Sequence, residues 1–215
     1  MCCPRAREWQ LHEIGPIGFD CDGHPVVLDR LSFIPPAELI AHFDAEAFLQ
    51  QQLYNLECLG AFKRAAGLRY GKRLYKAVHI VDMAGLSMAH LRERSFMTYV
   101  QHVNECVGWN YPETVLKFVV INAPVVFTAL WNMVKIVLHP VTVSKVHVSS
   151  GDPAKVLVDL GITLCDGGVT LPEKVPGWTA EMADLLSAYS LADLRDGFVP
   201  PEDLAALARI RAGKE

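Results

Sequence analysis

Apolar residues along the chain follow two periods, one typical of β-strands and one typical of α-helices. Short runs rich in apolar, mostly β-branched residues predict strands, and these runs span residues 26–31, 77–82, 115–121 and 143–148. Longer stretches with apolar positions three and four residues apart predict helices, and these stretches span residues 44–66, 90–107, 125–138 and 153–160. Because strands alternate with helices, the pattern predicts an α/β fold with a mainly parallel sheet and helices packed around it.

The two ends of the chain depart from this alternation. Residues 1–14 show no clear period and are expected to form a loose lead-in. The alternation fades past residue 171, where residues 181–189 and 201–212 predict surface helices of a C-terminal tail. Within the regular part, the helix expected over residues 44–66 should turn one apolar stripe toward the sheet. That stripe consists of Ala47, Phe48, Leu49, Leu53, Leu56 and Leu59.

Composition narrows the class of protein. Hydrophobic residues make up 51% of the 215 residues and the mean hydropathy is +0.21, which favours an unusually apolar interior. The net charge of −4 leaves no basic surplus that would favour nucleic acid as a partner. The six cysteines form neither a C-x-x-C pair nor a Cys/His cluster with zinc spacing. They predict free thiols in a reducing cytosol and no metal site.

The most apolar stretch, residues 115–138, is long enough to suggest a membrane span. A transmembrane helix needs about 20 consecutive, mostly apolar residues. Here Lys117, Asn122, Pro124 and Lys135 interrupt the run. The stretch therefore predicts a strand, a turn and a helix.

Motifs for nucleotide binding and hydrolysis are incomplete. Three residues separate Gly67 from Gly71 where a P-loop has four, and Arg73 stands where magnesium needs serine or threonine. There is no G-x-G-x-x-G after a strand and no G-x-S-x-G nucleophile elbow. We therefore expect neither an enzyme nor a cofactor. A nucleotide-using α/β enzyme is the rival hypothesis, and mass spectrometry of the purified protein would reveal its nucleotide.

Two polar residues lie inside predicted strands. His79 is interpreted as a hydrogen-bonded core residue, with catalysis as the alternative. Lys145 stands among valines of the strand expected over residues 143–148. This strand is expected to be central in the sheet, where a charge is costly unless an opposite charge or a hydrogen bond compensates it. The Lys145 side chain could extend to solvent, pair with a carboxylate such as Glu113, or face a polar ligand group. Ligands of open α/β sheets often bind near strand ends.

Five motifs occur in a fixed order, at Gly18–Val26, Ile80–Ser87, Tyr111–Glu113, Ile121–Pro124 and Pro140–Lys145. In this order they resemble the CRAL-TRIO lipid-binding domain of yeast-type phosphatidylinositol-transfer proteins. Each motif is short and weak by itself, but the whole set is specific because the spacing also fits. The resemblance spans residues 15–177, leaving residues 178–215 as the C-terminal helical tail.

The resemblance implies a lipid pocket floored by the sheet and closed by a mobile gate helix. It assigns the phosphoinositol headgroup to Glu113, Thr142 and Lys145, since an ammonium and a hydroxyl suit a phosphate and a carboxylate suits inositol hydroxyls. It assigns the gate to apolar residues of the helix expected over residues 125–138. These gate residues are Phe127, Leu130, Trp131, Val134 and Leu138.

The implied function is to bind one phospholipid, expected to be phosphatidylinositol, and to transfer or present it between membranes. The protein would be cytoplasmic and would touch a membrane surface transiently. A lipid-sensing regulatory or scaffold module keeps the same pocket without exchanging its contents, and vesicle-to-vesicle transfer would separate the two. A carrier of another hydrophobic ligand, such as a tocopherol, retinoid or sterol, is a further alternative.

The sequence departs from the family pattern in two ways. The helical lobe that usually precedes the sheet domain is expected to be absent, because residues 1–14 are too few for it. Members that exchange phosphatidylcholine have serine and threonine where this chain has Ala77 and His79. Because alanine offers no hydrogen bond and histidine is bulkier than threonine, phosphatidylcholine is expected to bind worse than phosphatidylinositol.

Overall fold

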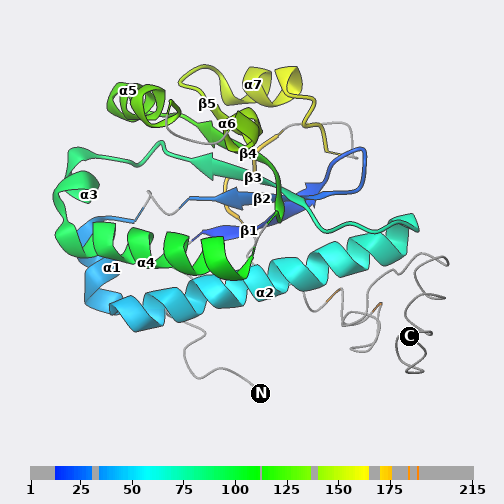
Figure 1. Ribbon diagram of the computed structural model, residues 1–215, viewed down its shortest axis with the longest axis horizontal. Coiled ribbons are helices and arrows are strands. Elements are labelled where there is room, and N and C mark those ends of the chain that lie inside the picture. The colour runs from blue at the N-terminus through cyan, green and yellow to red at the C-terminus, as the bar shows by residue number, and fades with distance from the viewer. Residues whose placement is uncertain are drawn as a thin grey trace.

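The computed structural model describes residues 13–30, 34–111, 113–136, 140–164 and 170–175, together with residues 184 and 188. Within helices, the side chains of residues 91, 100, 104, 129, 130, 133 and 134 lie outside the description. The helices and strands follow one another along the chain as shown in Figure 1. They are β1 (Ile14–Phe19), β2 (Pro25–Asp29), α1 (Pro36–His42), α2 (Ala45–Tyr70), β3 (Ala77–Asp82), α3 (Met88–Arg92), α4 (Arg94–Asn110), β4 (Val115–Ile121), α5 (Val125–Val134), α6 (Pro140–Lys145), β5 (Val146–Val148) and α7 (Pro153–Asp159).

The strands form one five-stranded sheet in the order β1-β2-β3-β4-β5. Strands β2 to β5 are parallel and β1 is antiparallel to β2, which confirms the predicted mainly parallel sheet. Strand β1 was not predicted, because Gly15, Pro16 and Gly18 argue against a strand. Proline is tolerated there because β1 lies at the edge of the sheet, and the register shifts between Pro16 and Gly18.

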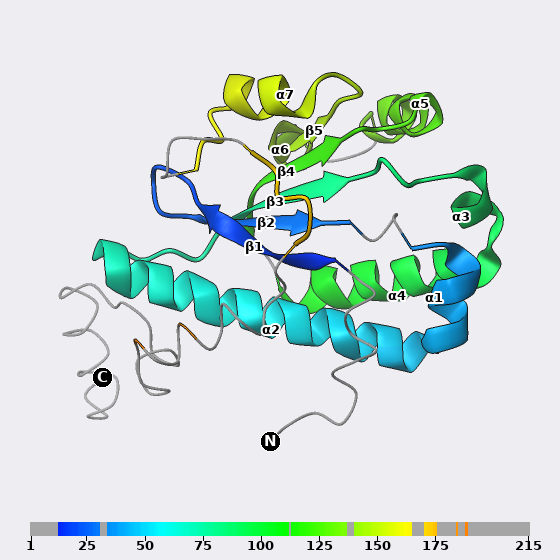
Figure 2. The same ribbon diagram turned by 180° about the vertical axis from the view of Figure 1, so that it is seen from behind.

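The strand order decides where the helices lie. Connections between parallel neighbours are almost always right-handed, so successive crossovers along β2 to β5 place their helices on one side of the sheet. Helices α2 and α4 pack against each other along that side (Figure 1), and α5 lies near the β5 edge. Helix α7 packs on the opposite side of the sheet, because its Leu157 contacts the cluster of Val26 and Val78, whereas α2 packs on Val27. The view from behind shows α7 beyond β5 (Figure 2). We call these two sides the crossover face and the α7 face.

The α7 face is closely packed. Side chains from β2, β3 and β4 meet α7 and the segment that follows it in one buried cluster. The cluster consists of Val26, Leu28, Val78, Ile80, Val119, Ile121, Leu157, Ile162, Leu164 and Val175. Burial of this apolar area is the main favourable contribution to the stability of the sheet.

The crossover face is covered unevenly. Near β2, the side chains of Cys58, Leu59 and Phe62 on α2 bury Val27 and Ala77. Toward β5, the apolar side chains of this face are only partly buried. They are Val81, Phe118, Val146 and Val148, which share the face by strand alternation and register. The sheet thus has one sealed face and one apolar face that the described helices leave half covered.

Two predictions about helices need correction. The predicted stripe of α2 is wrong in part, because Leu49, Leu53 and Leu56 are only partly buried, whereas Gln51 and Asn55 are buried. The reason is that α2 packs against both the sheet and α4, so the arc turned inward is wider than one apolar stripe. The helix predicted over residues 90–107 is two helices, α3 and α4, which meet at Glu93.

The strand predicted over residues 143–148 is also wrong in its first half. Residues 143–145 belong to α6, and β5 comprises only Val146–Val148 at the edge of the sheet. Pro140 suits the first position of a helix, and the Ser144 hydroxyl donates to the Val141 carbonyl within it. Lys145 is therefore the last residue of a helix and does not lie in a central strand. The two helices predicted for the C-terminal tail lie outside the described residues.

Candidate functional site

Glu113 and Lys145 meet at the end of the sheet where the parallel strands begin. We call this end the Glu113–Lys145 edge. Each residue stands just before a strand, Glu113 before β4 and Lys145 before its neighbour β5. The Lys145 ammonium donates a hydrogen bond to Oε2 of Glu113 over 2.7 Å, and the two side chains are 22% and 69% exposed. This hydrogen bond and the Lys145 charge lower the pKa of Glu113, and Lys76 adds to the effect. Of the three possibilities for Lys145, the carboxylate partner is the one present.

A tight turn after α4 presents the Glu113 carboxylate. Glu113 has a φ of 55°, a left-handed backbone conformation that is unfavourable for a residue with a side chain. The turn is held on both sides: the Thr114 hydroxyl donates to the Tyr111 carbonyl, and the Tyr111 hydroxyl donates to Glu57 of α2 over 2.6 Å. Burial, together with Glu57, raises the pKa of Tyr111 to about 12, so this hydroxyl remains a donor at physiological pH.

Thr142 completes the predicted headgroup set. It is exposed on α6, three residues before Lys145, and residues at this spacing are neighbours on a helix surface. The structure therefore brings Glu113 into contact with Lys145 and places Thr142 one helical turn away from that lysine. The arrangement offers a carboxylate, an ammonium and a hydroxyl at one exposed edge.

The predicted gate helix corresponds to α5, which carries exposed apolar side chains. Val125 and Val126 are 83% and 50% exposed, whereas Phe127 and Trp131 are partly buried. The side chains of Leu130 and Val134, and the whole of Leu138, lie outside the described residues. Within those residues, no helix is long and apolar enough to cross a membrane.

His79 interrupts the apolar crossover face. Its imidazole stacks on Phe118 of β4, with ring centroids 6.3 Å apart, and keeps some accessible surface. The ring is nevertheless surrounded by protein, and this desolvation lowers the pKa of His79 to about 4, with Lys63 of α2 adding to the effect. The side chain is therefore neutral at physiological pH. In the described part of the chain, no cluster of His, Cys, Asp and Glu could hold a metal ion.

Comparison with known proteins decides the family. The profile of the CRAL/TRIO domain matches residues 13–158, about two thirds of the chain. The chain belongs to the CRAL/TRIO domain family. A search of solved structures agrees on the fold: the crystal structure of Sfh5 matches with a TM-score of 0.55 at 14% identity, covering 87% of this chain and 68% of that chain.

Two curated relatives show how far the sequence similarity extends. The phosphatidylinositol/phosphatidylcholine transfer protein SFH9 of Arabidopsis thaliana is 32% identical over 140 residues, 65% of this chain and 24% of that protein. The Sec14 cytosolic factor of Schizosaccharomyces pombe is 29% identical over 175 residues, 75% of this chain and 60% of that protein. The chain thus matches about a quarter of the first relative and three fifths of the second.

Two motif residues of this CRAL/TRIO domain form a buried polar network. Oδ1 of Asp82, at the end of β3, accepts hydrogen bonds from the Asn122 amide over 2.8 Å and from the Ala84 backbone over 3.1 Å. Oδ2 of Asp82 accepts from Arg30 over 3.4 Å, and Arg30 also donates to the Glu173 carbonyl over 2.8 Å. Asn122 has a φ of 51° and lies just before the residues that lead into α5. The network therefore fixes the start of α5 to the sheet.

Sequence reasoning missed this network, although its signal was present. Asp82 and Asn122 each belong to one of the family motifs, but neither residue was given a structural role from the sequence. A carboxylate at the end of a buried strand needs hydrogen-bond donors, and an asparagine between a strand and a helix suits a left-handed turn. Parallel strands β3 and β4 are neighbours and end at the same edge of the sheet. Together these points predict a contact between the two side chains.

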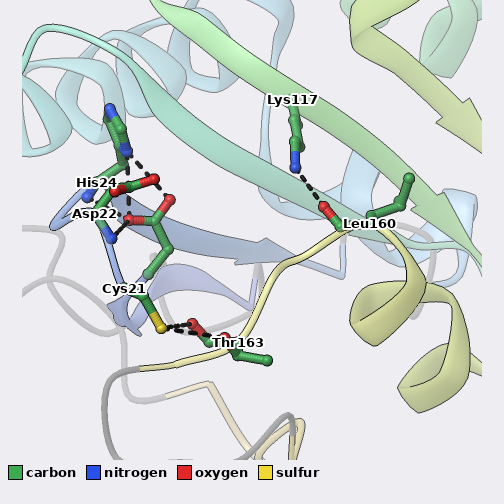
Figure 3. A network of polar contacts seen from close by, with 7 residues as sticks. Cys21, Asp22, His24, Lys117, Leu160 and Thr163 are labelled. Atoms are coloured by element: carbon green, nitrogen blue, oxygen red, sulfur yellow. Dashed lines mark hydrogen bonds and ion pairs between the residues drawn. The ribbon is translucent and has the colours of Figure 1, made fainter.

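Further contacts tie the segment after α7 to the sheet. Figure 3 shows the Lys117 ammonium of β4 donating to the Leu160 carbonyl, and Cys21 contacting Thr163. In the same view the His24 ring forms a contact within the turn after β1, where its Nδ1 lies 3.1 Å from Oδ2 of Asp20. Lys117 thus holds the end of α7 against the sheet and is not part of the exposed Glu113–Lys145 edge.

Proposed function

We propose that this CRAL/TRIO domain binds one phospholipid and carries it between membranes, with phosphatidylinositol as the ligand. The observation that carries the proposal is the Glu113–Lys145 pair, which stands at the edge of a sheet whose crossover face is apolar and half covered. A lipid needs both features, a polar site for its headgroup and an apolar surface for its chains. The two relatives described above, one named as a phosphatidylinositol/phosphatidylcholine transfer protein, support it.

The headgroup would bind at Glu113, Thr142 and Lys145. An ammonium and a hydroxyl donate to phosphate oxygens, and a carboxylate accepts from the hydroxyls of inositol. The existing ion pair has to rearrange for this to happen. Because an ion pair at an exposed edge contributes little net stability, exchanging it for contacts to a ligand costs little. No covalent bond is made or broken in this function.

The acyl chains would lie on the crossover face between α4 and α5. Phe118, Val146 and Val148 offer apolar surface there that the described helices do not cover fully. Covering such surface stabilises a complex by roughly 25 cal/mol for each Å² of apolar area removed from water. Bound lipid chains would therefore complete the core on this side of the sheet, and the complex would be more stable than the protein without lipid.

Lipid selectivity tests the proposed function directly. We expect the purified protein to transfer phosphatidylinositol between vesicles and to transfer phosphatidylcholine more slowly or not at all. The reason is that Ala77 offers no hydrogen bond to a choline headgroup, while His79 is bulky and neutral. Radiolabelled donor vesicles with each lipid in turn measure the two rates. Equal rates would contradict the selectivity, and no transfer of either lipid would contradict the carrier function.

Gate motion is a separate expectation. Exchange of an enclosed lipid requires α5 to swing, and its exposed Val125 and Val126 would then contact the bilayer. Trp131 suits a membrane interface, so its fluorescence should shift to the blue when vesicles are added. The measurement uses a variant in which Trp9, Trp109 and Trp178 are replaced by phenylalanine.

The matching functional test is Trp131→Ala. This variant should still bind phosphatidylinositol but transfer it more slowly, because the helix loses its interfacial anchor. A spectrum that vesicles leave unchanged, combined with an unaltered transfer rate in Trp131→Ala, would show that α5 is a fixed part of the core.

A further inference from the structure

Helix α2 turns a polar stripe toward the interior of the protein. Gln51, Asn55, Leu59 and Lys63 follow one another at four-residue spacing, and all four are buried. A helix packed on a sheet normally buries apolar residues along such a stripe. Here Lys63 is only 8% exposed and Asn55 only 5% exposed. The stripe needs an explanation because buried polar groups are costly unless they form hydrogen bonds.

The register of α2 places Lys63 opposite His79. Helix α2 runs antiparallel to β2: Tyr70 lies against the turn at Gly23, while Leu59 and Phe62 pack on Val27 farther along the strand. Val27 pairs with His79 of the neighbouring β3. Lys63, which follows Phe62, therefore reaches the crossover face at the level of the His79–Phe118 stack.

Lys63 has no partner of its own at this place. It forms no hydrogen bond or ion pair with another residue in the described part of the chain. The nearest charges that act on it are Glu57, whose Oε1 accepts from Tyr111, and Arg64. Asp29 acts on His79 from β2. Desolvation lowers the pKa of the Lys63 ammonium.

Apart from the buried Oε1 of Gln51, an acceptor at the end of the stripe far from Lys63, the polar groups that carry the argument are hydrogen-bond donors. Lys63 has three N–H donors and no acceptor. The Asn55 amide nitrogen is buried and has no acceptor among the described residues. Neutral His79 can donate from one ring nitrogen. This part of the crossover face is therefore suited to bind an oxygen atom that accepts hydrogen bonds.

We infer that Lys63 holds an acceptor oxygen of the bound lipid, either an ester carbonyl of a diacyl phospholipid or the carboxylate of a fatty acid. The phospholipid form rests on the proposed function. The location fits it: Phe118 is three residues along β4 from Val115, about 10 Å inward from the Glu113 edge at about 3.3 Å per residue. In a phospholipid, the ester carbonyls likewise follow the phosphate toward the acyl chains.

The experiment compares three probes on the full chain: diacyl phosphatidylinositol, its dialkyl ether analogue, which lacks the carbonyls, and oleate. Competition against a fluorescent lipid measures each affinity. The parent should bind the diacyl form about tenfold more tightly than the ether form, the size expected for hydrogen bonds to a charged group. Lys63→Met should bind both forms with the affinity that the parent has for the ether. The control is Lys155→Met, an exposed residue on α7.

The outcomes separate the sources of the oxygen. A tenfold loss of oleate binding in Lys63→Met, with no ester preference in the parent, assigns the site to a carboxylate. A parent that shows neither an ester preference nor oleate binding overturns the inference without any variant. If the parent binds neither form of phosphatidylinositol, the proposed function fails, and the oleate arm alone decides the role of Lys63.

A second measurement guards against misfolding. Without ligand, Lys63→Met should melt at or above the temperature of the parent, because the substitution removes the charge of a largely buried residue that has no partner in the described part of the chain. Lys63→Gln keeps an N–H donor and should retain part of the ester preference. Equal loss of preference in Lys63→Gln and in the Lys155→Met control would also contradict the inference.

Discussion

Replacing Lys145 with alanine should weaken phosphatidylinositol binding at least about 30-fold while the fold survives. Truncating one partner of a buried, hydrogen-bonded charge contact has effects of this size, and a bound headgroup would bury Lys145 further. The fold should survive because Lys145 lies at the end of a short helix and pairs only with an exposed carboxylate among the described residues. Titration with vesicles of stated phosphatidylinositol content measures the affinity.

Two companion variants make the Lys145 experiment decisive. Lys155→Ala removes the same charge from an exposed site on α7 and should leave binding unchanged. The pair Glu113→Ala with Lys145→Ala removes both ends of the contact seen in the structure. If that double variant binds phosphatidylinositol as well as the parent does, the headgroup lies elsewhere and the assignment of Glu113, Thr142 and Lys145 is wrong.

Asp82→Ala should lower the free energy of unfolding by about 3–5 kcal/mol, the size seen when one partner of a buried ion pair is removed. The substitution removes the Asp82 carboxylate from the buried Arg30 guanidinium, which then keeps the Glu13 carboxylate at 3.4 Å, and it removes the acceptor of the Asn122 amide. Denaturation by urea measures the change. Asp22→Ala, at an exposed turn position, is the control and should stay within about 0.5 kcal/mol of the parent. A loss of less than about 1 kcal/mol for Asp82→Ala would show that the network is not a major source of stability.

The strands were predictable where their residues are apolar and unbroken. Residues 77–82 and 115–121 were predicted with the bounds that β3 and β4 have. Strand β1 escaped prediction because its glycines and proline carry no strand signal, and only its pairing at the sheet edge makes it a strand. Residues 143–145 were assigned to a strand because β-branched valines favour one. In the structure, tertiary context makes them the end of a helix.

The candidate site was predicted partly for the wrong reason. Lys145 drew attention because it was expected in a central strand, yet it lies on α6. Glu113, expected near the start of a neighbouring strand, was one of three possibilities for Lys145, and the structure shows this contact where β4 and β5 begin. Lys63 was not foreseen. Helical periodicity gives the positions that share a face, but the sequence favoured the stripe of leucines over the polar one.

The sealing of the α7 face by the last described segments has a consequence for synthesis on the ribosome. The five described strands have all emerged once β5 has been synthesised, but the cover of Val78, Ile80 and Val119 comes from Leu157, Ile162, Leu164 and Val175. Arg30 likewise forms its hydrogen bonds to the carbonyls of Pro172 and Glu173 only after these residues have been synthesised. A nascent chain that ends at Val148 therefore exposes a continuous apolar surface, which is prone to aggregation. The segment after α7 thus has to be synthesised before this apolar surface can be buried within the domain.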